Sequence, residues 1–217
     1  MTPSEVGPCA QDASSDARRR GARVWLDELE RLDVATYAAI ARSQTPLLDA
    51  AMSRLSRAAD YSKLSLGGAA VLAVLGGRRG RRAAAFGLAS VGVTATVVNV
   101  ALKPLGRRER PDRVRAQVPI ARHVPMPIST SFPSGHSAAA FAFATGAGHV
   151  LPLAGLPLRL LAALVAYSRV HTGVHYPVDV IAGALLGGAF AQLTTHALER
   201  RGAVSVGAAP ASAGAER

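Results

Sequence analysis

The chain has 217 residues, of which 49% are hydrophobic and 18% charged, and its formal net charge is +11. Only 5% are aromatic, so small aliphatic residues supply most of the apolar surface, as in closely packed membrane helices. The basic residues flank apolar segments and are not interleaved with aromatic residues, which excludes a typical single-strand nucleic-acid binder and favours an anionic membrane surface. The single cysteine, Cys9, excludes an intramolecular disulfide and a cysteine-based metal cluster.

The N-terminal part is polar and then amphipathic. Residues 1–22 are rich in serine, alanine, aspartate and proline and lack the apolar core of a cleaved signal peptide, so we expect them to be disordered. Two amphipathic helices are predicted within residues 23–60, the second with Thr45 as N-cap and Pro46 at its first position. Both are too charged to span a bilayer. We expect them to lie at the membrane interface. The alternative is that they are helices of the soluble kind that pack against other parts of the protein.

Five apolar segments follow within residues 61–200. The clearest is charge-free over a length that can cross a bilayer, whereas Pro152 and Pro157 predict that another segment ends early, in a turn. The five segments are residues 64–77, 83–102, 137–158, 160–167 and 180–195. The predicted fold is therefore an all-α integral-membrane bundle of about five spanning helices, and residues 201–217 are expected to form a disordered tail.

Charge patterning predicts an orientation. The short basic loop 78–82 belongs in the cytoplasm by the positive-inside rule, which places the loop 103–136 outside. That outer loop is itself strongly basic, against the same rule, and this indicates that its charges are kept for function. We expect a multi-pass protein of the plasma membrane whose polar helix ends face the extracytoplasmic side.

Three polar clusters occupy helix ends on that side. Arginine and lysine side chains together with a helix N-terminus bind tetrahedral dianions, and two histidines supply a nucleophile and a proton donor. Asp179 follows His175 by four residues, with Pro177 at the predicted start of a helix, so the carboxylate can orient the imidazole ring. The three clusters are "KPLGRRERP" from Lys103, "PSGH" from Pro133 and "SRVHTGVHYPVD" from Ser168.

The spacing Lys-x6-Arg-Pro, then Pro-Ser-Gly-His, then Ser-Arg-x5-His-x3-Asp resembles the three-part signature of the type 2 phosphatidic acid phosphatase superfamily, which vanadium haloperoxidases share. All three parts occur in order and without substitution, and the helical pattern extends the resemblance over residues 33–199. The resemblance implies a phosphomonoesterase or pyrophosphatase, acting in many members on membrane lipids, with no metal and no other cofactor.

The resemblance also implies a role for each signature residue. His175 is the nucleophile that forms a phosphohistidine, Asp179 orients it, and His136 protonates the leaving oxygen. The remaining signature residues hold the phosphoryl oxygens; they are Lys103, Arg110, Ser134, Gly135 and Arg169.

Polar residues outside the signature are given structural interpretations. His171 is structural or close to the substrate, Ser168 caps locally or contributes to the site, and Asn99 makes an interhelical hydrogen bond. Four further arginines are expected to form a solvated or headgroup-facing surface, with substrate contact as the alternative: Arg107, Arg108, Arg113 and Arg115. Three histidines are expected to be satisfied or interfacial: His123, His149 and His196. Three glycines are expected to serve intramolecular helix packing: Gly183, Gly187 and Gly188.

The leading hypothesis is an outward-facing integral-membrane phosphatase for a lipid phosphate or diphosphate: a polyprenyl phosphate or diphosphate, phosphatidate or phosphatidylglycerophosphate. The first alternative is a vanadate-dependent haloperoxidase, against which the membrane segments argue. A non-catalytic protein that binds phospholipid headgroups is the second, although binding alone requires no nucleophile. Nucleic-acid binding is the weakest alternative, and we expect no nucleic-acid partner.

Overall fold

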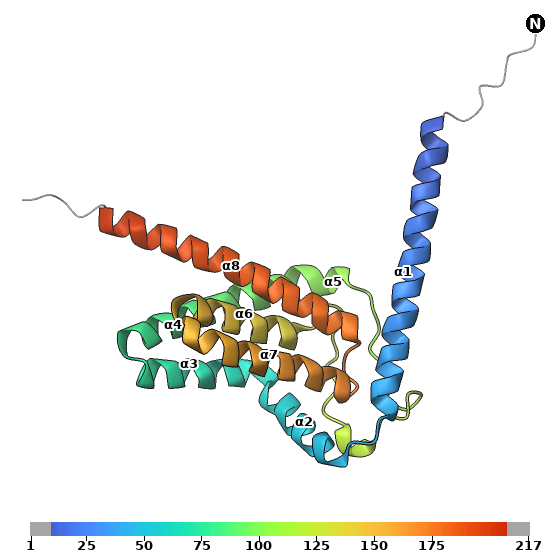
Figure 1. Cartoon of the computed structure of the whole chain (residues 1–217), viewed down its shortest axis with the longest axis horizontal. Helices are drawn as coiled ribbons and strands as arrows, with labels where there is room; N and C mark the ends of the chain where they lie inside the picture. Colours follow the sequence, from blue (N-terminus) through green and yellow to red (C-terminus); the bar gives the residue numbers. More distant parts are fainter. Residues whose placement is uncertain (1–9, 208–217) are drawn as a thin grey trace, which may run out of the picture.

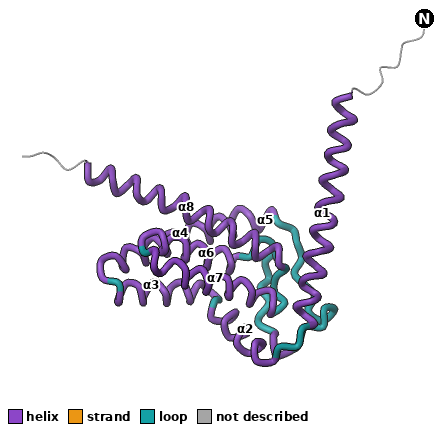
Figure 2. The backbone as a smooth tube through the Cα atoms, viewed as in Figure 1, coloured by secondary structure: helices purple, strands orange, loops and turns teal. Residues whose placement is uncertain are grey.

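A computed structural model describes residues 10–207, and within this range the chain is helical and contains no β-strand (Figure 2). The expected all-α fold is therefore confirmed. Residues 1–9, which include Cys9, and residues 208–217 lie outside the described part of the chain. The disorder predicted for these two segments therefore stays a prediction.

The N-terminal helix starts earlier than predicted. Helix α1 spans Ala10–Arg42, so residues 10–22 are helical where disorder was expected. Residues 10–20 contain neither glycine nor proline, and their alanines, arginines and glutamine favour a helix. The prediction of disorder was based on the overall composition of residues 1–22 and did not take this local helix propensity into account. Helix α2 spans Pro46–Ala58 with Thr45 as N-cap and Pro46 at its start, as predicted.

The remaining helices form a bundle (Figure 1). Their bounds are Lys63–Leu75 for α3, Gly77–Thr96 for α4, Lys103–Leu105 for α5, Gly135–Val150 for α6, Pro152–His171 for α7 and Pro177–Gly207 for α8. Helix α6 is central and packs against α4, α7 and α8. Helix α8 continues through Gly207, into the segment expected to be a disordered tail.

Within residues 10–207, three helical stretches are long and apolar enough to cross a membrane: Gly77–Leu105, Pro152–His171 and Pro177–Arg201. The predicted break at Pro152 is confirmed, because α6 ends at Val150 and α7 begins at Pro152. The turn does not extend to Pro157 as expected, since Pro157 lies inside α7. The apolar segment 160–167 is part of α7. Helices α3 and α6 have 13 and 16 residues and are shorter than a typical span, so the total of five spans stays a prediction.

The bundle exposes large apolar side chains and buries small ones. Val74, Leu153 and Leu185 are 78%, 93% and 70% exposed, whereas the interior is lined mainly by alanine. In water such an outer surface would be costly, but lipid tails solvate it, and small interior residues allow helices to approach closely. The exposed apolar surface thus agrees with a membrane bundle.

Two of the predicted packing glycines lie where α8 crosses α6. A Cβ atom on Gly187 would lie 2.2 Å from the carbonyl oxygen of Ala138, and one on Gly183 would lie 2.4 Å from that of Ser134. Both contacts are far too short for any side chain, which confirms the intramolecular packing role. Gly188 is less constrained, since its Cβ would first meet Thr145 at 4.0 Å.

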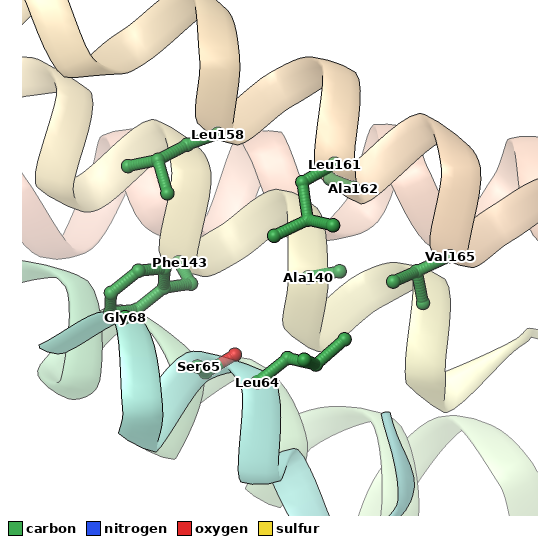
Figure 3. Close-up of a pocket in the computed structure, with 9 residues that line it drawn as sticks. All are labelled: Leu64, Ser65, Gly68, Ala140, Phe143, Leu158, Leu161, Ala162 and Val165. Carbon is green, nitrogen blue, oxygen red and sulfur yellow. The ribbon is translucent and has the colours of Figure 1, made fainter. Parts of the chain in front are cut away.

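A small apolar cavity separates α3 from α6 and α7 (Figure 3). Its volume is about 40 Å³, and Phe143 and Leu161 project into it from opposite sides. Ser65 contributes the one polar side chain among the nine residues drawn around it, and none of the nine is titratable. This cavity is a packing defect of the bundle and is not a reaction site.

The polar helix ends gather at the opposite end of the bundle from the α3–α4 and α6–α7 turns. Helices α6 and α8 begin there and α7 ends there, and the loop 106–134 with α2 and the C-terminal end of α1 surrounds them (Figure 1).

Candidate active site

A histidine and an aspartate are paired at the start of α8. The His175 Nδ1 atom lies 3.5 Å from the Asp179 Oδ2 atom, across one turn as the spacing predicts. The same carboxylate oxygen accepts hydrogen bonds from the backbone N–H of Tyr176, at 2.9 Å, and from the Ser131 hydroxyl. His175 and Asp179 are 1% and 0% exposed, so the pair is held inside the protein.

A tight turn places His175 over the end of α7. The backbone N–H groups of Val174 and His175 both donate to the carbonyl oxygen of Arg169, at 2.9 and 3.2 Å. Gly173 makes this turn with φ of +68°, and a Cβ atom there would also lie 3.0 Å from the Tyr37 hydroxyl. Glycine is the residue that adopts this left-handed conformation at little cost.

Arg110 faces the outer nitrogen of His175. Its Nη1 atom lies 3.2 Å from His175 Nε2 and donates to the carbonyl oxygen of Val174 at 3.0 Å. Its Nε atom donates to the carbonyl oxygen of Ser129 at 2.8 Å. Backbone acceptors thus fix a guanidinium group directly beside the nitrogen expected to attack phosphorus.

Two more cations come from neighbouring helices. The Lys103 ammonium donates to the Ser129 hydroxyl at 3.1 Å and would lie 3.5 Å from a Cβ atom on Gly135. Arg169 is 1% exposed and donates from Nη1 to the Ser56 hydroxyl at 2.6 Å. Its buried Nε atom has no hydrogen-bond partner among the described residues, which makes it a donor suited to an anion.

The Pro-Ser-Gly-His segment forms the N-terminus of α6. Ser134 is the N-cap; its hydroxyl oxygen accepts from the Ser137 hydroxyl at 3.0 Å, and its backbone N–H donates to the Asp179 carbonyl oxygen at 2.9 Å. These bonds give Ser134 a structural role, and its contact with phosphate stays a prediction. Gly135 begins the helix, where free N–H groups and the helix dipole favour an anion.

His136 lies in a recess of about 150 Å³ together with Lys103, Gly135 and Asn99. It is also within electrostatic range of His175, Arg110 and Arg169. The structure therefore brings all eight predicted site residues to one end of the bundle: Lys103, Arg110, Ser134, Gly135, His136, Arg169, His175 and Asp179.

The interhelical hydrogen bond predicted for Asn99 is wrong. Its side-chain amide donates within the same helix, to the carbonyl oxygen of Ala95 at 2.8 Å. Asn99 lies in a π-helical turn, Val97–Leu102, that follows α4, and it lines the recess beside Lys103. Such turns often occur at functional sites, and a regular helical period does not predict them.

Arg108 was expected on the surface, and that interpretation is wrong. Its Nη1 atom pairs with Asp179 Oδ1 at 2.9 Å and its Nη2 atom with Asp33 Oδ2 at 2.6 Å. The guanidinium carbon also lies 4.2 Å from the centre of the Tyr176 ring. Asp33, on α1, also accepts a hydrogen bond from the backbone N–H of Val178 at 2.8 Å. Its contacts at the start of α8 were not predicted from the sequence. Arg108 therefore connects α1 to the carboxylate that orients His175.

Arg113 also departs from the predicted surface role. It donates to the carbonyl oxygens of Gly173 and Val124, at 3.2 and 2.8 Å, and so stabilises the turn that carries His175. Arg107 and Arg115 are exposed, as expected.

The amphipathic N-terminal helices pack their inner faces against the site end of the bundle. Asp49 of α2 pairs with the fully buried Arg122 at 2.8 Å and with His171 Nε2 at 2.9 Å. Arg122 also donates to the carbonyl oxygen of Ile40, at the end of α1, at 3.0 Å. His171 thus has a structural role, the first of the two that we considered for it.

Ser168 and the three other histidines discussed from the sequence have hydrogen-bond partners, as expected. The Ser168 hydroxyl donates to the carbonyl oxygen of Val165 at 2.7 Å, and this favours the local of its two interpretations. His123 and His196 bond the carbonyl oxygens of Val118 and Gln192, at 3.1 and 2.7 Å. His149 lies 2.7 Å from a carboxylate oxygen of Glu199.

The surroundings of His175 favour its neutral form. Burial lowers the pKa of His175 to about 4. The hydrogen bond that the ring donates to Asp179 raises this pKa, and the positive charge of Arg110 lowers it further. At neutral pH the ring is therefore uncharged. Because Nδ1 faces Asp179, the lone pair of the neutral ring is on Nε2, which accepts a hydrogen bond from Arg110 Nη1 at 3.2 Å.

A buried histidine–aspartate pair that faces three cations and a helix N-terminus, inside an all-α membrane bundle, has the parts of a phosphoryl-transfer site. The PAP2 superfamily matches residues 83–203, more than half of the chain. The chain belongs to this family, and its curated relatives are phosphatases.

Two curated relatives and one solved structure illustrate the similarity. The decaprenylphosphoryl-5-phosphoribose phosphatase of Mycobacterium tuberculosis is 42% identical over 94 residues, which are 43% of this chain and 49% of that protein. The undecaprenyl-diphosphatase of Sulfolobus acidocaldarius is 48% identical over 67 residues, 29% of this chain and 31% of that protein. The matched part is thus about half or less of these relatives. The crystal structure of a PAP2-type phosphatidylglycerolphosphate phosphatase from Bacillus subtilis superposes with a TM-score of 0.62 at 26% identity, covering 80% of this chain and 87% of that one.

Proposed function

We propose that this protein is a membrane phosphatase that hydrolyses a lipid phosphate monoester or diphosphate through a phosphohistidine at His175, without a metal ion. One observation carries the proposal: His175 is buried, its Nδ1 faces Asp179, and its Nε2 lies 3.2 Å from Arg110. These positions support His175 as the nucleophile, Asp179 as its orienting carboxylate and Arg110 as a phosphate-binding cation.

The reaction follows from these positions. The Nε2 lone pair of His175 attacks phosphorus, a nitrogen–phosphorus bond forms, and the bond to the leaving oxygen breaks. His136 donates a proton to that oxygen, while Lys103, Arg110 and Arg169 neutralise the equatorial oxygens. Water then attacks the phosphohistidine, with His136 as the base, and releases inorganic phosphate.

An apolar hollow beside the site supports a lipid substrate. Its volume is about 540 Å³, and it is formed where α5 and the end of the π-helical turn before it face α8. Leu102, Leu105 and Leu185 line it, and Pro133 of the signature turn closes one side. A hydrocarbon chain bound there would have its phosphate near the N-terminus of α6. The activities of the relatives, which concern polyprenyl-linked and glycerolipid phosphates, agree with this substrate class.

The site is proposed to face the extracytoplasmic side of the plasma membrane. The basic residues 78–82 were expected to form a loop, but they belong to the first turns of α4. They lie at the opposite end of the bundle from the site, which fits a cytoplasmic position for them and an outward-facing site.

The test is phosphate release by detergent-purified protein, with EDTA present, from undecaprenyl diphosphate, phosphatidate and phosphatidylglycerophosphate. His175→Ala should abolish release, whereas His196→Ala, at an exposed histidine distant in sequence from the signature, should not. Release that persists in His175→Ala would contradict the mechanism. Peroxide-dependent halogenation that requires vanadate would favour the haloperoxidase alternative, and lipid binding without any phosphate release would favour a headgroup-binding protein.

A further inference from the structure

Asp60 is an acidic side chain outside the signature that contacts the predicted general acid. It lies in a short 3-10 turn, Asp60–Ser62, between α2 and α3. Its Oδ1 atom is 2.9 Å from His136 Nε2 and 3.6 Å from Arg169 Nη1. The side chains of His136 and Asp60 are 22% and 28% exposed, so the pair lies at the mouth of the site, where a leaving group departs.

The backbone beside Asp60 is held in an unfavourable conformation. Tyr61 and Ser62 have φ values of 56° and 57°, in the left-handed region, which costs a residue with a side chain about 1–2 kcal/mol. Tyr61 is 87% exposed, so burial of its ring does not offset this cost. The helices on both sides of the turn are fixed, α2 by the bond between Ser56 and Arg169 and α3 by its packing against α4. The turn therefore sets the position of Asp60 against His136.

A carboxylate at this place has a chemical consequence for His136. A general acid must carry its proton when the leaving group departs, yet burial lowers the pKa of His136, and the positive charges of Arg169, Lys103 and Arg110 lower it further. Asp60 supplies the opposite charge within hydrogen-bond distance. With Nε2–H donated to Asp60, Nδ1 is the ring nitrogen available to the leaving oxygen.

We propose that Asp60 is a positioning residue for His136: it holds the Nε2–H group and stabilises the imidazolium form that protonates the leaving group. The proposal rests on the proposed phosphatase function. In the step concerned, the bond between His175 Nε2 and phosphorus forms and the phosphorus–oxygen bond breaks, leaving its electron pair on the departing oxygen. That oxygen takes the Nδ1 proton of His136, which becomes neutral and regains a proton from the water that hydrolyses the phosphohistidine.

The dependence on the leaving group tests this role. An alkoxide departs only with a proton, whereas 4-nitrophenolate departs readily without one. Asp60→Asn should therefore lower kcat/KM for decyl phosphate by about tenfold to hundredfold, but for 4-nitrophenyl phosphate by less than about threefold. The value of kcat/KM is the proper measure because it includes leaving-group departure and not the later hydrolysis of the phosphohistidine.

Matched variants separate the proposal from a structural role. His136→Ala should show the same selective loss, Asp60→Asn should add little to it in the double variant, and Asp60→Glu should retain more alkyl phosphate activity than Asp60→Asn. Asp27→Asn, at an exposed aspartate of α1, should leave both substrates unaffected.

Equal losses on both substrates would overturn the proposal, since they would mean that Asp60 acts through Arg169 or through the fold. Absence of phosphate release by the wild-type protein from both substrates would overturn the proposed function, and this proposal with it.

Discussion

The connection made by Arg108 leads to a quantitative prediction about α1. Arg108 pairs with Asp33 and Asp179, whose side chains are 1% and 0% exposed, while its own side chain is 23% exposed. Removing one partner of a buried ion pair costs about 3–5 kcal/mol because the other charge is left uncompensated. Because Arg108 is partly exposed, we expect the lower end of this range. Arg108→Ala should therefore reduce the free energy needed to detach α1 from the bundle by about 3 kcal/mol.

Trypsin cleavage measures that detachment. Arg42, at the end of α1, becomes a substrate when the helix leaves the bundle, and the cleavage rate follows the population of the open form when reclosing is fast. A loss of about 3 kcal/mol should raise the rate of cleavage after Arg42 about a hundredfold, since each 1.36 kcal/mol is tenfold. The cleaved fragment is identified by mass spectrometry.

Two further variants make this experiment decisive. Arg107→Ala removes a neighbouring exposed arginine and should leave the cleavage rate unchanged. Asp33→Asn combined with Arg108→Ala should recover part of the loss, because the second substitution removes one unpaired charge. Equal cleavage rates for Arg108→Ala and Arg107→Ala would refute the conclusion that the Arg108 ion pairs hold α1 in place.

Two other predictions concern the nucleophile and the packing of α8. Because the pKa of His175 is lowered to about 4, the ring is protonated and inactive only at low pH, so kcat/KM should fall as the pH drops through about 4. The second ionisation of the substrate also changes kcat/KM, so its pKa is measured by phosphorus NMR and its effect is subtracted. An acidic limb near the ordinary histidine value would show that burial and Arg110 do not have the effect described. Gly187→Ala should lower the thermal stability of the bundle markedly, because its Cβ atom would lie 2.2 Å from the Ala138 carbonyl oxygen. Gly92→Ala, whose Cβ atom would meet nothing within 4 Å, should be tolerated, and similar melting temperatures for the two variants would contradict the close approach of α8 to α6.

The signature residues could be placed from the sequence because proline, glycine and helical spacing mark the helix ends that carry them. Pro177 starts α8, and so Asp179 reaches His175 across a single turn. Gly135 starts α6, and so His136 lies at the mouth of that helix. These relations are local, extending over one or two turns, and local relations are what spacing predicts.

The contacts that support the signature could not be placed in this way. Arg108 and Asp33 are 75 positions apart, and His136 and Asp60 are 76 apart, so each pair exists only through the packing of α1 and α2 on the bundle. Asp33, Asp60 and Arg108 are also charged residues outside the signature, a type that ordinarily lies on the surface. Asn99 was misplaced because a π-helical turn departs from the regular period on which its prediction depended.

The most direct test of the central claim is the detection of a covalent phosphoenzyme. The protein is mixed with a ³²P-labelled lipid phosphate and quenched within milliseconds in alkali, which preserves phosphohistidine, and the labelled peptide is sequenced. We predict label on His175, lost on acid treatment, absent in His175→Ala and increased in His136→Ala with a good leaving group, because hydrolysis of the intermediate then lacks its base. Catalytic phosphate release with no label on His175 at any time would contradict the account.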